Sequence, residues 1–226
     1  MRTHTQETQA TITPAKALTF LTEGNERFRT NLQVSRDLLK QVNETREGQF
    51  PFATVLSCID SRTSAELIFD QGLGDIFSIR LAGNVVTEDV LGSMEFSCKV
   101  AGSRLIVVLG HSQCGAIKGA CDGVQLGNLS TLLNRIQPAI YRERTETRDR
   151  SSKNPAFVER VAEIHVRRCV NAIVEQSPVL REMIDRGEVG LIGGMYSVET
   201  GAVTFLDDTL RLGGQAARPT AHAALA

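Results

Sequence analysis

The feature that most constrains the fold is a series of short, almost wholly apolar segments separated by longer, helix-like ones. Residues 52–58 (FATVLSC), 75–83 (DIFSIRLAG) and 104–111 (RLIVVLGH) are rich in β-branched residues and end in Gly, Cys or His. Strands without a polar face are typical of a parallel sheet whose two faces are both covered by helices. The pattern therefore predicts an α/β fold with a mostly parallel central sheet.

Helical patterns fill the stretches between these segments, and two more strand candidates lie near the end of the chain. The expected helices cover residues 14–28, 35–46, 87–100, 114–122 and 154–176. The last two strands, 189–198 and 202–206, flank an ETG turn signal that favours a hairpin, and hence an antiparallel edge. We expect one domain over residues 13–210, with flexible tails at 1–12 and 211–226.

Composition excludes several classes of function. The 226 residues carry a formal net charge of −1, which gives no reason for binding to nucleic acid or to an anionic membrane. No apolar run approaches the roughly 18 residues that cross a bilayer. The polar first twelve residues do not resemble a secretory signal, and the five cysteines are an odd number, so we expect a cytoplasmic protein with free thiols rather than a disulfide framework.

Three residues with metal-binding side chains follow the carboxyl ends of predicted strands. Cys58 ends the first strand segment, and His111 and Cys114 follow the third. If these strands are neighbours, about 5 Å apart, the three side chains converge. Two thiolates and one imidazole suit zinc, and three protein ligands leave a fourth position open, as in catalytic rather than structural zinc sites.

Asp60 and Arg62 lie beside this predicted site, and the sequence allows two arrangements of the Asp60 carboxylate. The Asp60 carboxylate can bind the metal as a fourth ligand and close the site. Alternatively, it can pair with the Arg62 guanidinium, whose geometry fits a carboxylate, and accept a hydrogen bond from a zinc-bound water. Zinc lowers the pKa of bound water to about 7, so the expected chemistry is attack of hydroxide on a small electrophile.

The two motifs together resemble those of the β-class carbonic anhydrases. The resemblance rests on C-x-D-x-R at Cys58, on H-x-x-C at His111, and on the flanking IRLAGN (79–84) and GHSQCGAIKGA (110–120), and it covers about residues 14–206. It implies reversible hydration of carbon dioxide to bicarbonate and a proton, by zinc hydroxide that an Asp–Arg dyad orients. It also implies a homodimer or a dimer of dimers, with amino-terminal helices packed on the partner subunit.

The resemblance assigns expected roles to individual residues. Cys58, His111 and Cys114 match the zinc ligands, Asp60 and Arg62 match the dyad, and Asp60 also matches a fourth ligand of the closed state found in some members. Gln49 matches an amide that reaches the substrate, often across the dimer, and Ala82 and Gly115 match positions that line the substrate pocket.

The chain departs from the family pattern at one position that bears on regulation. Some members bind regulatory bicarbonate through a Trp, Arg and Tyr trio; Arg80 and Tyr196 match two positions, but Val55 replaces the Trp. This weakens the hypothesis of a bicarbonate sensor. Two more functions compete with hydration of carbon dioxide: hydrolysis of carbonyl sulfide or carbon disulfide, and a zinc-binding structural or redox-sensing module without catalysis. His165 lies in a helical pattern, so a structural role is expected for it.

Overall fold

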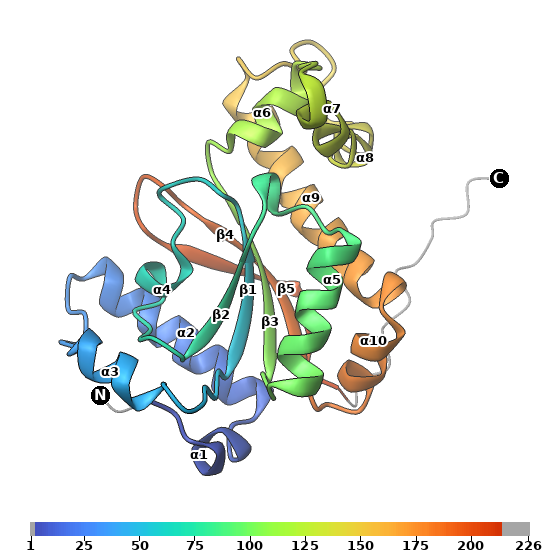
Figure 1. Cartoon of the computed structure of the whole chain (residues 1–226). Helices are drawn as coiled ribbons and strands as arrows, with labels where there is room; N and C mark the ends of the chain where they lie inside the picture. Colours follow the sequence, from blue (N-terminus) through green and yellow to red (C-terminus); the bar gives the residue numbers. More distant parts are fainter. Residues whose placement is uncertain (1–2, 214–226) are drawn as a thin grey trace.

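The structure is a computed structural model that describes residues 3–213, and in it a twisted sheet lies between two layers of helices (Figure 1). The five strands of the described residues are ordered β2-β1-β3-β4-β5. Their bounds are Ala53–Ser57 (β1), Ile76–Arg80 (β2), Leu105–His111 (β3), Gly190–Tyr196 (β4) and Val203–Arg211 (β5). The first four strands are parallel and β5 is antiparallel to β4, so the predicted fold class is confirmed.

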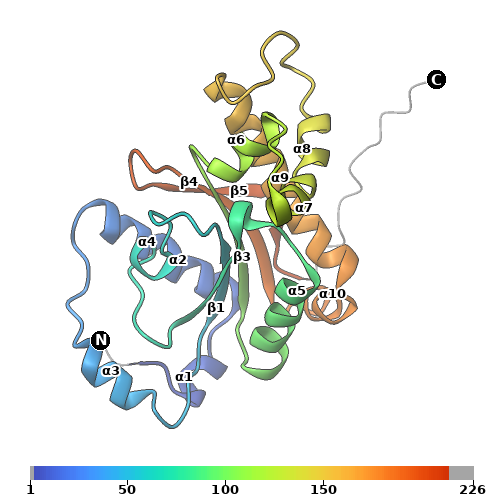
Figure 2. The same ribbon diagram turned by 45° about the horizontal axis from the view of Figure 1, so that its top comes forward.

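Helices cover both faces of the sheet, and Figure 2 shows the same layers after rotation. The α-helices are α1 (Gln6–Ala10), α2 (Pro14–Arg29), α3 (Leu38–Glu44), α4 (Ala65–Ile68), α5 (Glu88–Glu95), α6 (Gly115–Cys121), α7 (Gly127–Asn134), α8 (Gln137–Arg142), α9 (Pro155–Gln176) and α10 (Pro178–Asp185). Two further helical segments are η1 (Ala82–Asn84), a 3₁₀ turn, and η2 (Phe96–Val100), a π-helix that continues α5. None of the described helices is long and apolar enough to cross a membrane.

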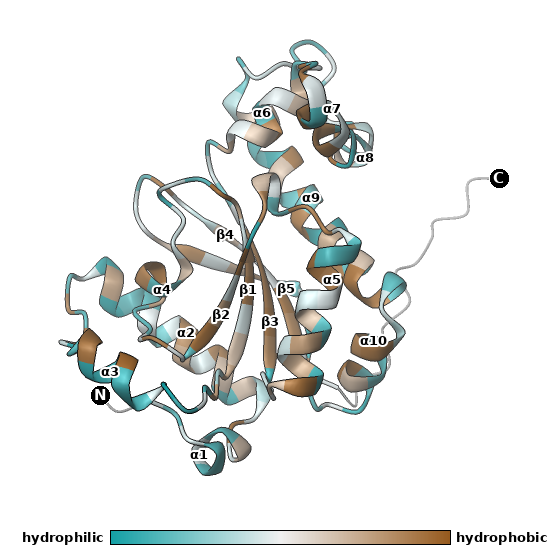
Figure 3. Ribbon diagram, viewed as in Figure 1, coloured by the Kyte–Doolittle hydropathy of each residue, from teal (hydrophilic) through white to brown (hydrophobic). Residues whose placement is uncertain are grey.

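Two apolar cores lie on opposite faces of the sheet, and β1, β3 and β4 are buried along their whole length. Figure 3 shows the central strand β3 largely in the colour of hydrophobic residues. On one face, α9 packs closely against β3 and β4. A Cβ atom added at Gly110 or Gly193 would lie 2.6 or 2.7 Å from a methyl group of Val166, so this close approach requires glycine in both strands. On the other face, α2 and α4 supply buried side chains such as Leu21 and Ile68.

The amino-terminal segment corrects one expectation. Within residues 1–12, which we expected to form a loose tail, Gln6–Ala10 are helical and Thr5 and Thr8 form a reciprocal capping box. The buried amide of Gln9 donates to the carbonyl oxygens of Pro51 (2.7 Å) and Ala101 (2.8 Å). These bonds attach α1 to the domain, although the segment has no apolar stripe that would predict it. At the other end β5 continues to Arg211, and residues 214–226 of the predicted tail lie outside the described residues.

Candidate metal centre

Strands β1 and β3 are parallel neighbours, and their pairing assembles the centre. Ser57 lies opposite Leu109, so Cys58, directly after β1, is level with the end of β3, where His111 is the last residue. The chain then turns through Gln113, which has a positive φ of 58°, and α6 begins after Cys114. The two strands are therefore adjacent, as the predicted convergence of the three side chains required.

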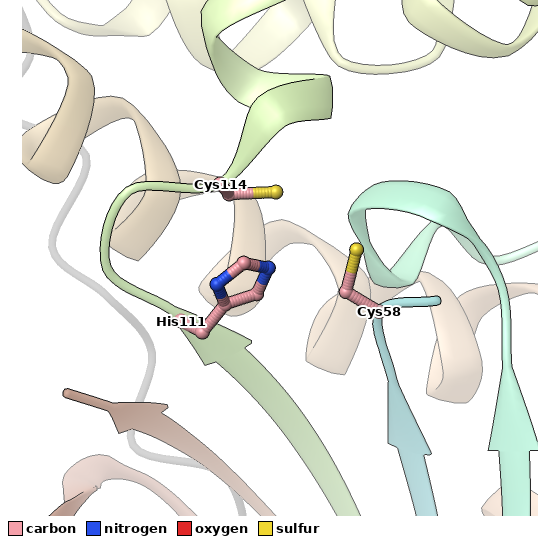
Figure 4. Close-up of side chains that lie close together, drawn as sticks. All are labelled: Cys58, His111 and Cys114. Atoms are coloured by element: carbon pink, nitrogen blue, oxygen red, sulfur yellow. The ribbon is translucent and has the colours of Figure 1, made fainter. Parts of the chain in front are cut away.

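The side chains of Cys58, His111 and Cys114 face one another (Figure 4). Their ligand atoms all lie within 4.8 Å of one another, and all three residues are buried. All five cysteines of the chain are free, so the two facing thiols form no disulfide. The three residues form a cluster that could hold a metal ion.

The imidazole of His111 has a ring nitrogen whose lone pair is free to bind such an ion. Its Nδ1 lies 2.9 Å from the carbonyl oxygen of Ser112, which can only accept, so Nδ1 carries the proton. Its Nε2 is buried and has no hydrogen-bond partner among the described residues. A buried nitrogen left unpaired is costly unless a further group binds it, and a metal ion between the two sulfurs would do so.

The two sulfur atoms have different environments. The hydrogen bond from the Cys114 thiol, together with the Gly83 N–H at 3.3 Å, lowers the pKa of Cys58 despite its burial. The same bond to Cys58, with burial, raises the pKa of Cys114. Cys58 is therefore the thiol that ionises first, and the thiolate is the form that binds metal.

Asp60 lies outside the cluster, because Arg62 binds its carboxylate. Arg62 donates from Nε to Oδ1 (2.9 Å) and from Nη2 to Oδ2 (2.8 Å), and its backbone N–H donates to Oδ1 (3.0 Å). These bonds hold the pKa of Asp60 well below its usual range. Of the two arrangements that the sequence left open, the structure contains the paired one, and it brings together three of the four predicted metal ligands.

A family model of carbonic anhydrases matches residues 53–203, two thirds of the chain. The chain belongs to the β-carbonic anhydrase family. It is 35% identical over 206 residues to carbonic anhydrase 2 of Mycobacterium tuberculosis, with 88% of this chain and 96% of that protein covered. It is 32% identical to a carbonic anhydrase of Synechococcus elongatus, with 84% of this chain and 73% of that protein covered.

Solved structures agree with this family. The β-carbonic anhydrase CafA of Aspergillus fumigatus superposes with a TM-score of 0.66 at 26% identity, covering 85% of this chain and 90% of that one. A Coccomyxa β-carbonic anhydrase in complex with acetazolamide, at 22% identity, shares the fold with the same TM-score and covers 84% and 86% of the two chains. The chain is thus a carbonic anhydrase, with a Cys-His-Cys cluster where a metal ion fits.

The loop that carries Asp60 in this carbonic anhydrase is fixed by two residues whose roles the motifs do not give. Thr63 is the first residue of T-S-A-E (63–66), a pattern typical of helix caps. Its hydroxyl donates to the carbonyl oxygens of Cys58 (3.0 Å) and Asp60 (2.9 Å). Helix α4 is instead preceded by Ser64, without a side-chain cap bond. Arg80 donates to the same two carbonyl oxygens, from Nε (3.1 Å) and Nη2 (2.6 Å).

The remaining residues with expected roles differ in their exposure. Gln49 is exposed in the loop before β1, Ala82 is half-buried in η1, and Gly115 is exposed at the start of α6. A Cβ atom added at Gly115 would meet nothing within 4 Å. Their roles toward substrate stay predictions. Val55, at the position of the family's regulatory Trp, is fully buried in β1.

Proposed function

We propose that this carbonic anhydrase hydrates carbon dioxide reversibly to bicarbonate and a proton, with zinc bound by Cys58 Sγ, His111 Nε2 and Cys114 Sγ. Family membership supports the reaction, and the donor set of two sulfurs and one nitrogen supports zinc. The observation that carries the proposal is the unpartnered, buried Nε2 of His111 beside two thiols. When bound, zinc supplies a Lewis acid that makes water nucleophilic near neutral pH.

The Asp60–Arg62 pair supplies the orientation that a catalytic site needs. Arg62 keeps Asp60 ionised and fixes both of its oxygens. Oδ2 accepts one hydrogen bond within the described residues, from Arg62 Nη2, so it keeps a lone pair for the proton of an incoming water. A purely structural metal site gains nothing from such a pair, so the pair favours an enzyme over a structural or redox-sensing module.

The substrate side of the proposal involves Gln49, Ala82 and Gly115. A Cβ atom added at Gly115 would meet nothing within 4 Å, so the residue directly after Cys114 leaves room for a small molecule. Gln49 would donate from its amide to the developing anion, and its exposed position fits a role completed by another subunit.

Assembly as a homodimer, or as a dimer of dimers, is part of the proposal. Four apolar side chains before β1 are at least half exposed, namely Leu32, Leu38, Leu39 and Val42. Apolar side chains exposed to this extent suit burial against a second copy of the chain. The structures of two β-carbonic anhydrases of Sordaria macrospora, one of which matches at 25% identity, are described as tetrameric. Light scattering coupled to size-exclusion chromatography would measure the mass.

We also propose a cytoplasmic location, because a reducing compartment suits five free cysteines. Fractionation of cells that express the full chain, with a cytoplasmic marker enzyme as control, would test it.

Stopped-flow measurement of hydration, with zinc quantified in the same samples, tests the function. We expect carbon dioxide to be turned over, and Cys58→Ser or His111→Asn to lose both zinc and activity. Parallel assays with carbonyl sulfide and carbon disulfide would detect turnover of these two gases. A zinc-loaded protein that turned over none of the three gases would favour a structural or redox-sensing module.

A further inference from the structure

His165 is a buried residue of α9 that is not one of the three candidate metal ligands. It is connected to the metal centre through a hydrogen bond with Gly83. Its Nε2 lies 2.9 Å from the carbonyl oxygen of Gly83, and the residue is 3% exposed. A carbonyl oxygen only accepts, so Nε2 carries the proton. Burial lowers the pKa of His165 to about 4, so the imidazole is neutral near pH 7, and its Nδ1 has no partner among the described residues.

Gly83 carries this contact to Cys58. Its N–H donates to Cys58 Sγ at 3.3 Å, while its carbonyl accepts from His165. Gly83 has a φ of +63°, and a Cβ atom there would lie 3.0 Å from Ile136 and 3.1 Å from Ala116. Glycine is required at this position, yet glycine itself restricts the backbone least, so contacts from outside must fix the direction of its N–H.

Helix α9 supplies such contacts from two residues one turn apart on the same face. His165 binds the carbonyl of Gly83, and Cys169, one turn later, places its thiol 3.5 Å from the carbonyl oxygen of Asn84. Burial raises the pKa of Cys169 to about 12, so this thiol keeps its proton and remains a donor. The turn that faces Cys58 is therefore attached to a helix that itself packs on β3 and β4.

We propose that His165 is a positioning residue, which holds Gly83 so that its N–H is directed at the Cys58 sulfur and tunes that sulfur as a metal ligand. The inference rests on the proposed zinc site. A hydrogen bond to a thiolate withdraws electron density from the sulfur and fixes its orientation, and contacts of this kind around metal ligands typically alter affinity ten- to hundredfold. His165 thus acts through Gly83 without touching the metal or the substrate.

A matched pair of variants tests the proposal. Gln and Met are similar in size and flexibility, but only Gln carries an N–H where the histidine has Nε2. For His165→Met we expect roughly ten- to hundredfold weaker zinc affinity in competition with a chelator. We also expect the sulfur-to-metal charge-transfer band of the cobalt-substituted protein to shift to longer wavelength, because a sulfur without its hydrogen bond is easier to oxidise. His165→Gln should restore both towards wild type.

A control separates positioning from packing. Val166, the next residue on α9, packs against β3 and β4, so Val166→Ala weakens the core without touching Gly83. It should lower the melting temperature and leave zinc affinity and the cobalt band unchanged. Wild-type affinity and an unshifted band in His165→Met would overturn the proposal. So would equal impairment of the Gln and Met variants.

The wild-type protein provides a second test should His165→Met not fold. Nitrogen-15 NMR of the zinc-loaded chain reports which imidazole nitrogen of His165 carries the proton. We expect protonation at Nε2, and a proton on Nδ1 alone would overturn the proposal because Gly83 could then receive no hydrogen bond. Failure of the wild-type protein to bind zinc would instead count against the proposed function, so the two failures are distinguishable.

Discussion

Arg62 binds both carboxylate oxygens of Asp60, two residues before it, through Nε at 2.9 Å and Nη2 at 2.8 Å. The side chain of Asp60 is 18% exposed and that of Arg62 is 51% exposed, so the pair lies closer to solvent than the buried Cys-His-Cys cluster. In this arrangement Arg62 engages both carboxylate oxygens, and Asp60 is not part of the Cys-His-Cys cluster.

Replacement of Arg62 tests the catalytic role of the pair. In Arg62→Ala the Asp60 carboxylate loses its fixed orientation, and we expect the rate of carbon dioxide hydration to fall on the order of 10²-fold. Arg62→Lys keeps the charge but not the two-pronged geometry, so it should be intermediate. Stopped-flow rates and zinc content would be measured together. A variant that kept its zinc and the full wild-type rate would show that the pair has no catalytic role.

Thr63 holds the loop that presents Asp60, through its hydroxyl bonds to the carbonyls of Cys58 and Asp60. Because this hydroxyl is buried, Thr63→Val should cost about 1–3 kcal/mol of stability, and the loosened loop should also slow hydration. Thr63→Ser keeps the hydroxyl and serves as the matched control. Denaturant unfolding and stopped-flow rates measure the two effects. Equal stability and rate in the valine and serine variants would contradict this role.

The cysteines should differ in their reaction with iodoacetamide at pH 8. Burial raises the pKa of Cys98 and of Cys169 to about 12, so both stay protonated and unreactive. The lowered pKa of Cys58 leaves it as a thiolate once metal is removed. Mass spectrometry should find Cys58 modified first in chelator-treated protein and protected after zinc is restored. Modification of Cys98 before Cys58 in folded protein would contradict the assignment.

Glu143, after α8, should make stability depend on pH in the acid range. Burial raises its pKa, but hydrogen bonds from Thr145 and from Arg160 outweigh burial and lower it to about 2. In the unfolded chain the pKa of this glutamate is near 4.3, so between about pH 4.3 and pH 2 the unfolded chain binds more protons than the folded one. The contribution of Glu143 to the free energy of unfolding is therefore complete above about pH 5 and is lost as the pH falls towards 2.

The matched variant for this prediction is Glu143→Gln, which removes the charge and keeps the shape. In zinc-free protein its melting temperature should lie below that of wild type at pH 7, and the gap should narrow from pH 5 to pH 3. A gap that stayed constant over this range, or widened, would contradict the sign of the effect.

The sequence predicted those parts of the fold that depend on local pattern. Strands such as 104–111 lack a polar face, which indicates burial on both sides, and the Cys and His residues at strand ends indicate a shared sheet edge. The convergence of Cys58 with His111 depends on β1 and β3 being neighbours. The order of the strands is a tertiary property, so no single segment of the sequence predicts it.

Contacts that join distant polar atoms were not predictable in this way. Gln9 attaches α1 through two backbone carbonyls, and His165 reaches a carbonyl 82 residues earlier in the chain. Neither contact leaves a periodic signal, because the accepting atom belongs to the backbone and is the same in every residue. Thr63 matched a capping pattern, yet its hydroxyl is used by the loop before it.

The most direct test of the central claim is a crystal structure of the zinc-loaded protein at neutral pH, with anomalous data collected at the zinc edge. We predict one zinc ion per chain, bound by Cys58 Sγ, His111 Nε2 and Cys114 Sγ, with Asp60 on Arg62 and no side chain in the fourth position. Zinc bound elsewhere, or these three side chains turned apart with ample metal present, would contradict the account.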